Sequence, residues 1–145
     1  MIKTQKKSKA ISLFICILTM MLFASYINLN ANASAQPTPF IYSGTSIYAY
    51  SDPRPKDNYT SAYAYNTGST CDIDAVNVYG CIMNAATIVS QVDCTAGTPM
   101  SLPLYGARYL PNYVKEYGYG FARLKFTVYS NAQKTLYGLW SPDSN

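Results

Sequence analysis

The cysteines are the first residues of this sequence that could do chemistry. The chain has 145 residues, with four cysteines and no histidine. Cys16 lies inside an apolar N-terminal run, which leaves Cys71, Cys81 and Cys94. A cysteine nucleophile needs a neighbouring base, most often a histidine, and a zinc site needs closely spaced cysteine and histidine ligands. The sequence therefore predicts neither a catalytic cysteine nor a metal centre.

The acidic residues Asp72 and Asp74 are a second candidate pair. A strand would place both carboxylates on one face, as a calcium site or a pair of catalytic acids requires. No third ligand is close in sequence, and the phosphate-binding G-x-x-x-x-G-K and nucleophile G-x-S-x-G patterns are both missing. We interpret the two acids as solvated surface residues. We expect a protein that is not an enzyme and needs no cofactor.

Tyrosine is unusually frequent, with 15 copies in the chain. Two Tyr-x-Tyr pairs, Tyr48/Tyr50 and Tyr63/Tyr65, recur at the same spacing, and in a strand both rings of such a pair lie on one face. We expect the two pairs to face each other on neighbouring strands and to form one aromatic stripe. Two interpretations stay open: a binding face for a glycan or a partner surface, or a wall of the core whose hydroxyl groups reach water or backbone.

The N-terminus has the pattern of a secretory signal peptide. Basic residues at positions 3, 6, 7 and 9 precede an apolar run at 10–27, and the small residues Ala33 and Ala35 follow as an A-x-A site. We predict a leader over residues 1–35, recognised by the export machinery and cut after Ala35, and a single domain over 36–145. Cleavage after Ala33 and a retained membrane anchor are the alternatives.

The positive charge of the chain belongs to this leader. The net charge is +4, and four of the 11 Lys and Arg residues lie in the first nine positions. Residues 36–145 therefore carry seven bases and seven acids. A neutral domain without a clustered basic stripe does not fit nucleic-acid binding. We expect a secreted protein, free or associated with the cell surface, that does not stay inserted in the membrane after cleavage.

An exported chain meets oxidising conditions, so its three remaining cysteines predict one disulfide and one odd thiol. If residues 71–81 are extended, their ends are about 33 Å apart, too far for a disulfide. A hairpin of residues 74–81 and 86–94 that turns near Asn84 would place Cys94 opposite residues 72–74. This geometry favours a Cys71–Cys94 disulfide and leaves Cys81 free.

Alternating apolar residues predict a β-rich domain. In residues 121–129, positions 122, 124, 126 and 128 are apolar on one face, and in residues 134–140 Leu136 and Trp140 share a face, so we predict a C-terminal hairpin. Further strands are predicted at 39–42, 46–50, 61–65, 75–81, 86–92 and 102–108, and a short helical turn at 112–117. About 6 to 8 short strands in one domain indicate an all-β fold, a small antiparallel β-sandwich or barrel, of which we favour the sandwich.

Three segments resemble a family of small exported proteins from Gram-positive bacteria. They are the R-x-K-x-N-x-T-S-x-Y block at 54–63, the segment at 110–116, and the strand at 122–125 together with the closing G-L-W-S-P-D-S at 138–144. The family is similar in build to lactococcin-type bacteriocins, which are secreted β-sandwiches that act on cell-wall synthesis in neighbouring cells.

The resemblance implies a bacteriocin-like or bacteriocin-associated protein without enzymatic activity that acts at the cell envelope. Its partner would be a cell-wall precursor or an envelope protein of another bacterium. The alternative is a surface-retained adhesion module that binds through its tyrosines. In the closing motif, we expect Pro142 to end the last strand, Asp143 to accept backbone hydrogen bonds in a turn, and Trp140 to be buried.

Overall fold

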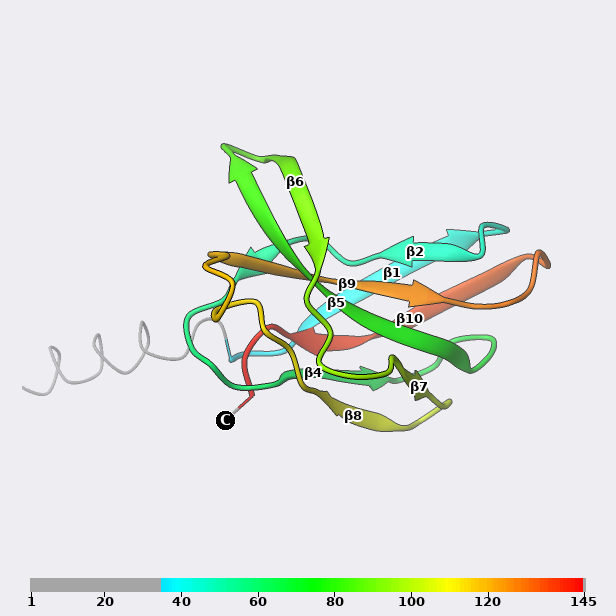
Figure 1. The fold of residues 1–145 in the computed structure, drawn as a ribbon. Helices are drawn as coiled ribbons and strands as arrows, with labels where there is room; N and C mark the ends of the chain where they lie inside the picture. The colour runs from blue at the N-terminus through cyan, green and yellow to red at the C-terminus, as the bar shows by residue number, and fades with distance from the viewer. Residues whose placement is uncertain (1–34, 145) are drawn as a thin grey trace, which may run out of the picture. The chain divides into compact units, whose positions relative to one another are not determined.

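The computed structural model of the protein describes residues 35–144, and these residues fold into two antiparallel β-sheets (Figure 1). No helix occurs among the described residues, so the prediction of an all-β fold is confirmed. The predicted leader lies outside the described residues except for its last residue, Ala35. None of the described residues forms a helix long and apolar enough to cross a bilayer.

Ten strands make up the two sheets. They are β1 (Thr38–Gly44), β2 (Tyr48–Tyr50), β3 (Arg54–Pro55), β4 (Ala62–Asn66), β5 (Ile73–Asn84), β6 (Thr87–Asp93), β7 (Met100–Leu102), β8 (Ala107–Leu110), β9 (Phe121–Thr127) and β10 (Lys134–Ser141). Sheet A has the order β1-β10-β4-β8. Sheet B has the order β2-β9-β5-β6, with β3 also beside β9 and β7 also beside β5. Figure 1 shows the end of the β5–β6 hairpin projecting beyond the other strands.

Two of the predicted elements differ from the structure. The segment predicted as one strand at 102–108 contains the ends of two strands, β7 and β8, separated by a turn in which Tyr105 has a φ of 56°. The predicted helical turn at 112–117 is confined to one turn, in which the Tyr117 N–H donates to the Tyr113 carbonyl at 3.0 Å, and Asn112 instead forms a β-bridge with Thr95. The strand β3 was missed because its two residues lie in a proline-rich stretch that reads as a turn.

Apolar residues of both sheets meet in one core. The rings of Phe40 on β1 and Phe126 on β9 stack at 4.3 Å between centroids and so join sheet A to sheet B. Leu124 on β9 and Leu136 on β10 are also buried in this cluster. Gly138 leaves room for the Phe40 ring, because a Cβ at this position would collide with that ring and with the Tyr65 carbonyl. The alternation in β9 and β10 is therefore as predicted.

The predicted C-terminal hairpin is wrong. β9 pairs with β2, β3 and β5, whereas β10 pairs with β1 and β4, so the two strands lie in opposite sheets. Their connection crosses between the sheets, and the buried Lys134 ammonium holds it by donating to the carbonyls of Ser130 (2.6 Å) and Ala132 (3.2 Å). Two strands that each bury one face show the same alternation whether they pair side by side or pack face to face.

Candidate functional site

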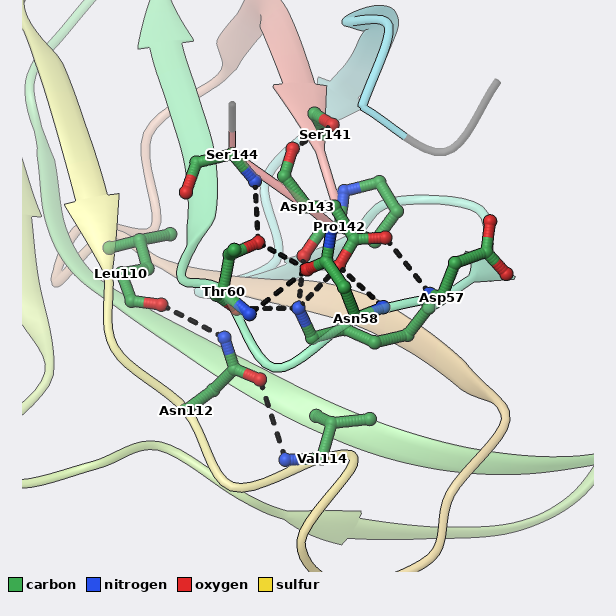
Figure 2. A network of polar contacts seen from close by, with 11 residues as sticks. Asp57, Asn58, Thr60, Leu110, Asn112, Val114, Ser141, Pro142, Asp143 and Ser144 are labelled. Atoms are coloured by element: carbon green, nitrogen blue, oxygen red, sulfur yellow. Dashed lines mark hydrogen bonds and ion pairs between the residues drawn. The ribbon is translucent and has the colours of Figure 1, made fainter. Parts of the chain in front are cut away.

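A buried ion pair joins the segment after β3 to the end of the chain. The Lys56 Nζ atom lies 2.7 Å from Oδ1 of Asp143, and the two side chains are 1% and 0% exposed. Figure 2 shows the turn around Pro142 and Asp143 lying against Asp57, Asn58 and Thr60. These residues come from the 54–63 block and from the closing motif, so two of the segments singled out in the sequence are in contact.

Every charged atom of this pair has hydrogen-bond partners. The Lys56 ammonium also donates to the carbonyls of Thr60 (2.6 Å) and Pro142 (2.8 Å), which gives each of its three protons an acceptor. The Asp143 carboxylate accepts from the backbone N–H groups of Asp57 (2.9 Å) and Asn58 (3.4 Å). Burial of two charges is tolerable only when they are paired and saturated in this way. The arrangement is therefore a structural joint.

Arg54 extends the joint to the start of the domain. Its Nη1 atom donates to the carbonyl of Gln36 (2.8 Å) and to that of Trp140 (3.1 Å), and its guanidinium carbon lies 5.8 Å from the centre of the Trp140 ring. Burial lowers the pKa of Arg54 from its usual value, and the negative charge of Asp143 partly opposes this shift. Arg54 thus holds the residue after the predicted cleavage point against the last strand.

Residues of the closing motif lie at the end of β10 and in the turn that follows it, next to the ion pair. Trp140 is 1% exposed in the core, and Pro142 directly follows the last residue of β10. The sequence predicts a separate role for each of these residues, but it does not predict that Asp143 pairs with Lys56. The sequence signal for it is only that one basic and one acidic residue occur in the two segments, because nothing in either segment indicates that both are buried.

A cavity of about 220 Å³ lies next to the joint. Tyr63 on β4 and Tyr109 on β8 contribute its aromatic wall, and their ring centroids are 5.5 Å apart. Its other lining residues come from the two ends of the domain: Ala35, Gln36, Pro37, Ser141, Asp143 and Ser144. The start and the end of the folded domain therefore share one depression.

The second candidate site is the outer face of sheet B. Lys125 Nζ lies 4.1 Å from the centre of the Tyr48 ring, and the Arg123 guanidinium carbon lies 4.4 Å from the centre of the Tyr50 ring. Tyr50 also meets Tyr79 edge-on, with 6.4 Å between their centroids. We call Tyr48, Tyr50, Tyr79, Arg123 and Lys125 the aromatic–cationic face. Tyr48 is 44% exposed and Tyr50 is 39% exposed, so both rings can meet a ligand.

The predicted stripe of four tyrosines is wrong, because its two halves lie in different sheets. Tyr48 and Tyr50 are on β2, which pairs with β9 in sheet B, whereas Tyr63 and Tyr65 are on β4, which pairs with β10 and β8 in sheet A. Tyr63 and Tyr65 are half-buried and alternate with buried alanines. Both Tyr-x-Tyr pairs do lie on strands, but these strands are not neighbours. After β2, the segment that contains β3 and its flanking loops leads the chain to sheet A, where β4 lies.

The predicted Cys71–Cys94 disulfide is also wrong, and all three described cysteines are free thiols. The β5–β6 hairpin forms, but it turns after Asn84 and contains a bulge, so Cys94 lies opposite Val78 and donates its N–H to the Val78 carbonyl at 2.8 Å. Cys71 precedes β5, whose stretch from Ile73 to Val78 is about 17 Å long. This separation exceeds the reach of a disulfide.

Burial controls the chemistry of two of these thiols. It raises the pKa of Cys81, against the opposing effect of the Arg123 charge, and it raises the pKa of Cys94, against a hydrogen bond from the Gly80 backbone. A raised pKa leaves less of the reactive thiolate at neutral pH. The structure therefore gives these cysteines the properties of core residues.

Asp72 and Asp74 support separate loops. An oxygen of Asp72 accepts the Leu104 N–H at 2.6 Å, and an oxygen of Asp74 accepts the Tyr129 N–H at 2.7 Å. Within residues 35–144, no three His, Cys, Asp or Glu side chains come together as a metal site would require. The aromatic–cationic face is thus the surface on which exposed rings and cations lie together as a binding site would require.

A family model described as "Protein of unknown function (DUF2712)" matches residues 23–144. No curated protein has significant similarity to the chain.

Proposed function

The chain belongs to the DUF2712 family of proteins of unknown function, and from its geometry we propose that it is an exported binding protein without enzymatic activity that acts at the bacterial cell envelope. The ligand is an envelope glycan or wall polymer that carries acidic groups, and it binds to the aromatic–cationic face. The observation that carries the proposal is the placement of Lys125 on the Tyr48 ring and Arg123 on the Tyr50 ring.

Tyrosine rings suit sugar ligands because one ring offers an apolar face and a hydrogen-bonding hydroxyl group. Tyr48 and Tyr50 alternate with the buried Ala49, so their backbone is fixed by core packing and both rings lie on the outer side. Their positions are therefore set before a ligand arrives. Binding to such a fixed surface loses less side-chain entropy than binding to flexible side chains.

The two cations add selectivity for acidic ligands. Arg123 and Lys125 lie two residues apart on β9, so their backbone positions are about 7 Å apart on one face. The nearest acid in the pairing register, Asp93 opposite Tyr79, is engaged by the Asn77 side chain at 2.8 Å and by Thr95. Among the described residues, the only side-chain ion pair is Lys56–Asp143, so neither cation is neutralised by a carboxylate.

The location at the envelope rests on the leader pattern of residues 1–35 and on the resemblance in the segments at 54–63 and 138–144. The proposal that the protein is not an enzyme rests on the residue types, since the chain has no histidine. The secreted protein remains free or loosely attached to the cell surface in this proposal.

The test is co-sedimentation of the purified secreted protein with isolated Gram-positive cell walls. The double variant Y48A/Y50A should bind about tenfold or more weakly, because each lost ring contact contributes about 1 kcal/mol. The double variant R123Q/K125Q should also bind more weakly than the wild type. Its difference in affinity from the wild type should shrink as salt is added, because salt screens the contribution of the two cations in the wild type. The difference between Y48A/Y50A and the wild type should not shrink in this way.

The double variant Y63A/Y65A is the matched control, because it removes the same residue types from the outer face of sheet A. It should bind like the wild type. Thermal unfolding of all variants checks that each is folded. If Y63A/Y65A loses binding and Y48A/Y50A keeps it, the assignment of the face is wrong, and if the wild type does not sediment with walls, the proposed function is wrong.

Bacteriocin-like inhibition of neighbouring bacteria is the second candidate function, favoured by the resemblance in residues 54–63, 110–116 and 138–144. It predicts that the purified protein slows the growth of related Gram-positive strains at micromolar concentration and binds a cell-wall precursor. Normal growth at those concentrations would leave wall binding as the sole proposal.

A further inference from the structure

We propose that Gln36, once it becomes the first residue, cyclises to pyroglutamate, so that the exported protein begins with a neutral lactam ring next to Arg54. This inference rests on the removal of the leader after Ala35 in the proposed function. It adds a modification site whose chemistry follows from the surroundings of Gln36 in the folded domain.

The fold fixes the backbone of Gln36 and leaves its side chain free. The Gln36 carbonyl is held 2.8 Å from Arg54 Nη1, and the following residue, Pro37, restricts Gln36 to an extended backbone. The Gln36 side chain is exposed, and no described residue hydrogen-bonds to its amide. Closing the ring therefore needs only side-chain rotations, with no break in the contacts of β1, which begins at Thr38.

The charges around Gln36 favour the reactive form of its amine. The amine nitrogen is three bonds from the carbonyl oxygen that Arg54 binds, which places it within about 6.5 Å of the guanidinium. The Arg54 guanidinium is the charged side-chain group that contacts Gln36 directly. A second positive charge beside it is unfavourable, so the neutral, nucleophilic amine gains population.

The reaction is balanced without an oxidant or a cofactor. The neutral amine nitrogen of Gln36 attacks the side-chain carbonyl carbon Cδ and forms a new N–Cδ bond. The Cδ–Nε2 bond breaks, the amine gives up a proton to the leaving nitrogen, and ammonia departs. The product is a five-membered lactam with no charge, which removes the positive charge that cleavage of the leader creates beside Arg54.

The test is the intact mass and the N-terminal peptide of the full-length protein after export from a Gram-positive host. The expected mass is that of residues 36–145 less one molecule of ammonia. Two variants accompany the wild type. Gln36→Asn keeps an amide but is one methylene too short for a five-membered ring, so it should retain its ammonia. Arg54→Gln removes the nearby cation, and its open form should disappear about three- to tenfold more slowly after secretion.

Arg54→Lys keeps the charge and controls for altered packing around Trp140, so it should cyclise at nearly the wild-type rate. An open glutamine on a chain of residues 36–145 would overturn the cyclisation and leave the proposed export intact. A mass that still includes residues of the leader, or that begins at Ser34, would overturn both the cleavage point and the cyclisation. Equal rates in wild type and Arg54→Gln would overturn the role of Arg54.

Discussion

Removal of one charge from the buried Lys56–Asp143 pair should destabilise the domain strongly. Lys56→Met removes the ammonium that pairs with the buried Asp143 carboxylate, and Asp143→Asn removes the negative charge that pairs with the buried Lys56 ammonium. A buried charge that loses its partner costs about 3–5 kcal/mol. A domain of this size has a free energy of unfolding of about 5–15 kcal/mol, so either change removes a large part of it.

Urea unfolding measures this loss. The chain has one tryptophan, Trp140, which is buried next to Arg54 and close to the joint, so its fluorescence reports unfolding at the right place. With a slope of about 2 kcal/mol per molar urea, a loss of 4 kcal/mol lowers the midpoint by about 2 M. Lys125→Met is the control, because this lysine contacts a partly exposed ring and its loss should cost less than about 1 kcal/mol.

The double variant K56M/D143N separates the pair from other effects of the substitutions. Because it removes both charges, it should be less destabilised than the sum of the single variants. Strictly additive losses would show that the two side chains do not stabilise each other. Losses below about 1 kcal/mol in both single variants would refute the inference that the ion pair is buried and holds the C-terminus in place.

Four further predictions concern core packing and burial. Trp140→Ala should lower the free energy of unfolding by about 3–5 kcal/mol, measured by circular dichroism in urea, and an unchanged midpoint would contradict its place in the core. Gly138→Ala should cost about 1–3 kcal/mol because its Cβ meets the Phe40 ring, whereas Gly68→Ala, with open space around it, should cost less, and equal midpoints would contradict the close packing of β1 on β10. Cys81 and Cys94 should react with a thiol reagent more slowly than the half-buried Cys71, and faster labelling of either would contradict their burial. Because burial raises the pKa of both thiols, the unfolded chain ionises first, so stability should fall as pH rises above about 8.5, and a Cys81→Ala/Cys94→Ala variant should lose that part of the pH dependence.

Local patterns in this sequence predict strands more successfully than strand partners. Alternation identifies the buried faces of β9 and β10, because a buried face needs apolar residues at every second position. The same alternation arises in a hairpin and in two strands packed face to face, which is why the C-terminal hairpin was predicted wrongly. The Tyr-x-Tyr repeat has the same ambiguity, since β2 and β4 share a pattern and lie in different sheets.

Long-range contacts account for the parts of the site that the sequence could not reveal. Lys56 lies in a segment of turn-forming residues, and nothing local distinguishes it from an exposed lysine. It is buried because Asp143, at the other end of the domain, supplies the opposite charge. Likewise, alternation in residues 121–129 leaves Arg123 and Lys125 on the face opposite the apolar residues, and their contacts with Tyr50 and Tyr48 follow from the pairing of β2 with β9.

The most direct test of the proposed function is a comparison of two double variants in cell-wall binding. The dissociation constant for isolated Gram-positive walls should rise about tenfold or more in Y48A/Y50A and stay at the wild-type value in Y63A/Y65A. Equal dissociation constants for wild type and Y48A/Y50A, with both proteins folded, would contradict binding through the aromatic–cationic face of sheet B.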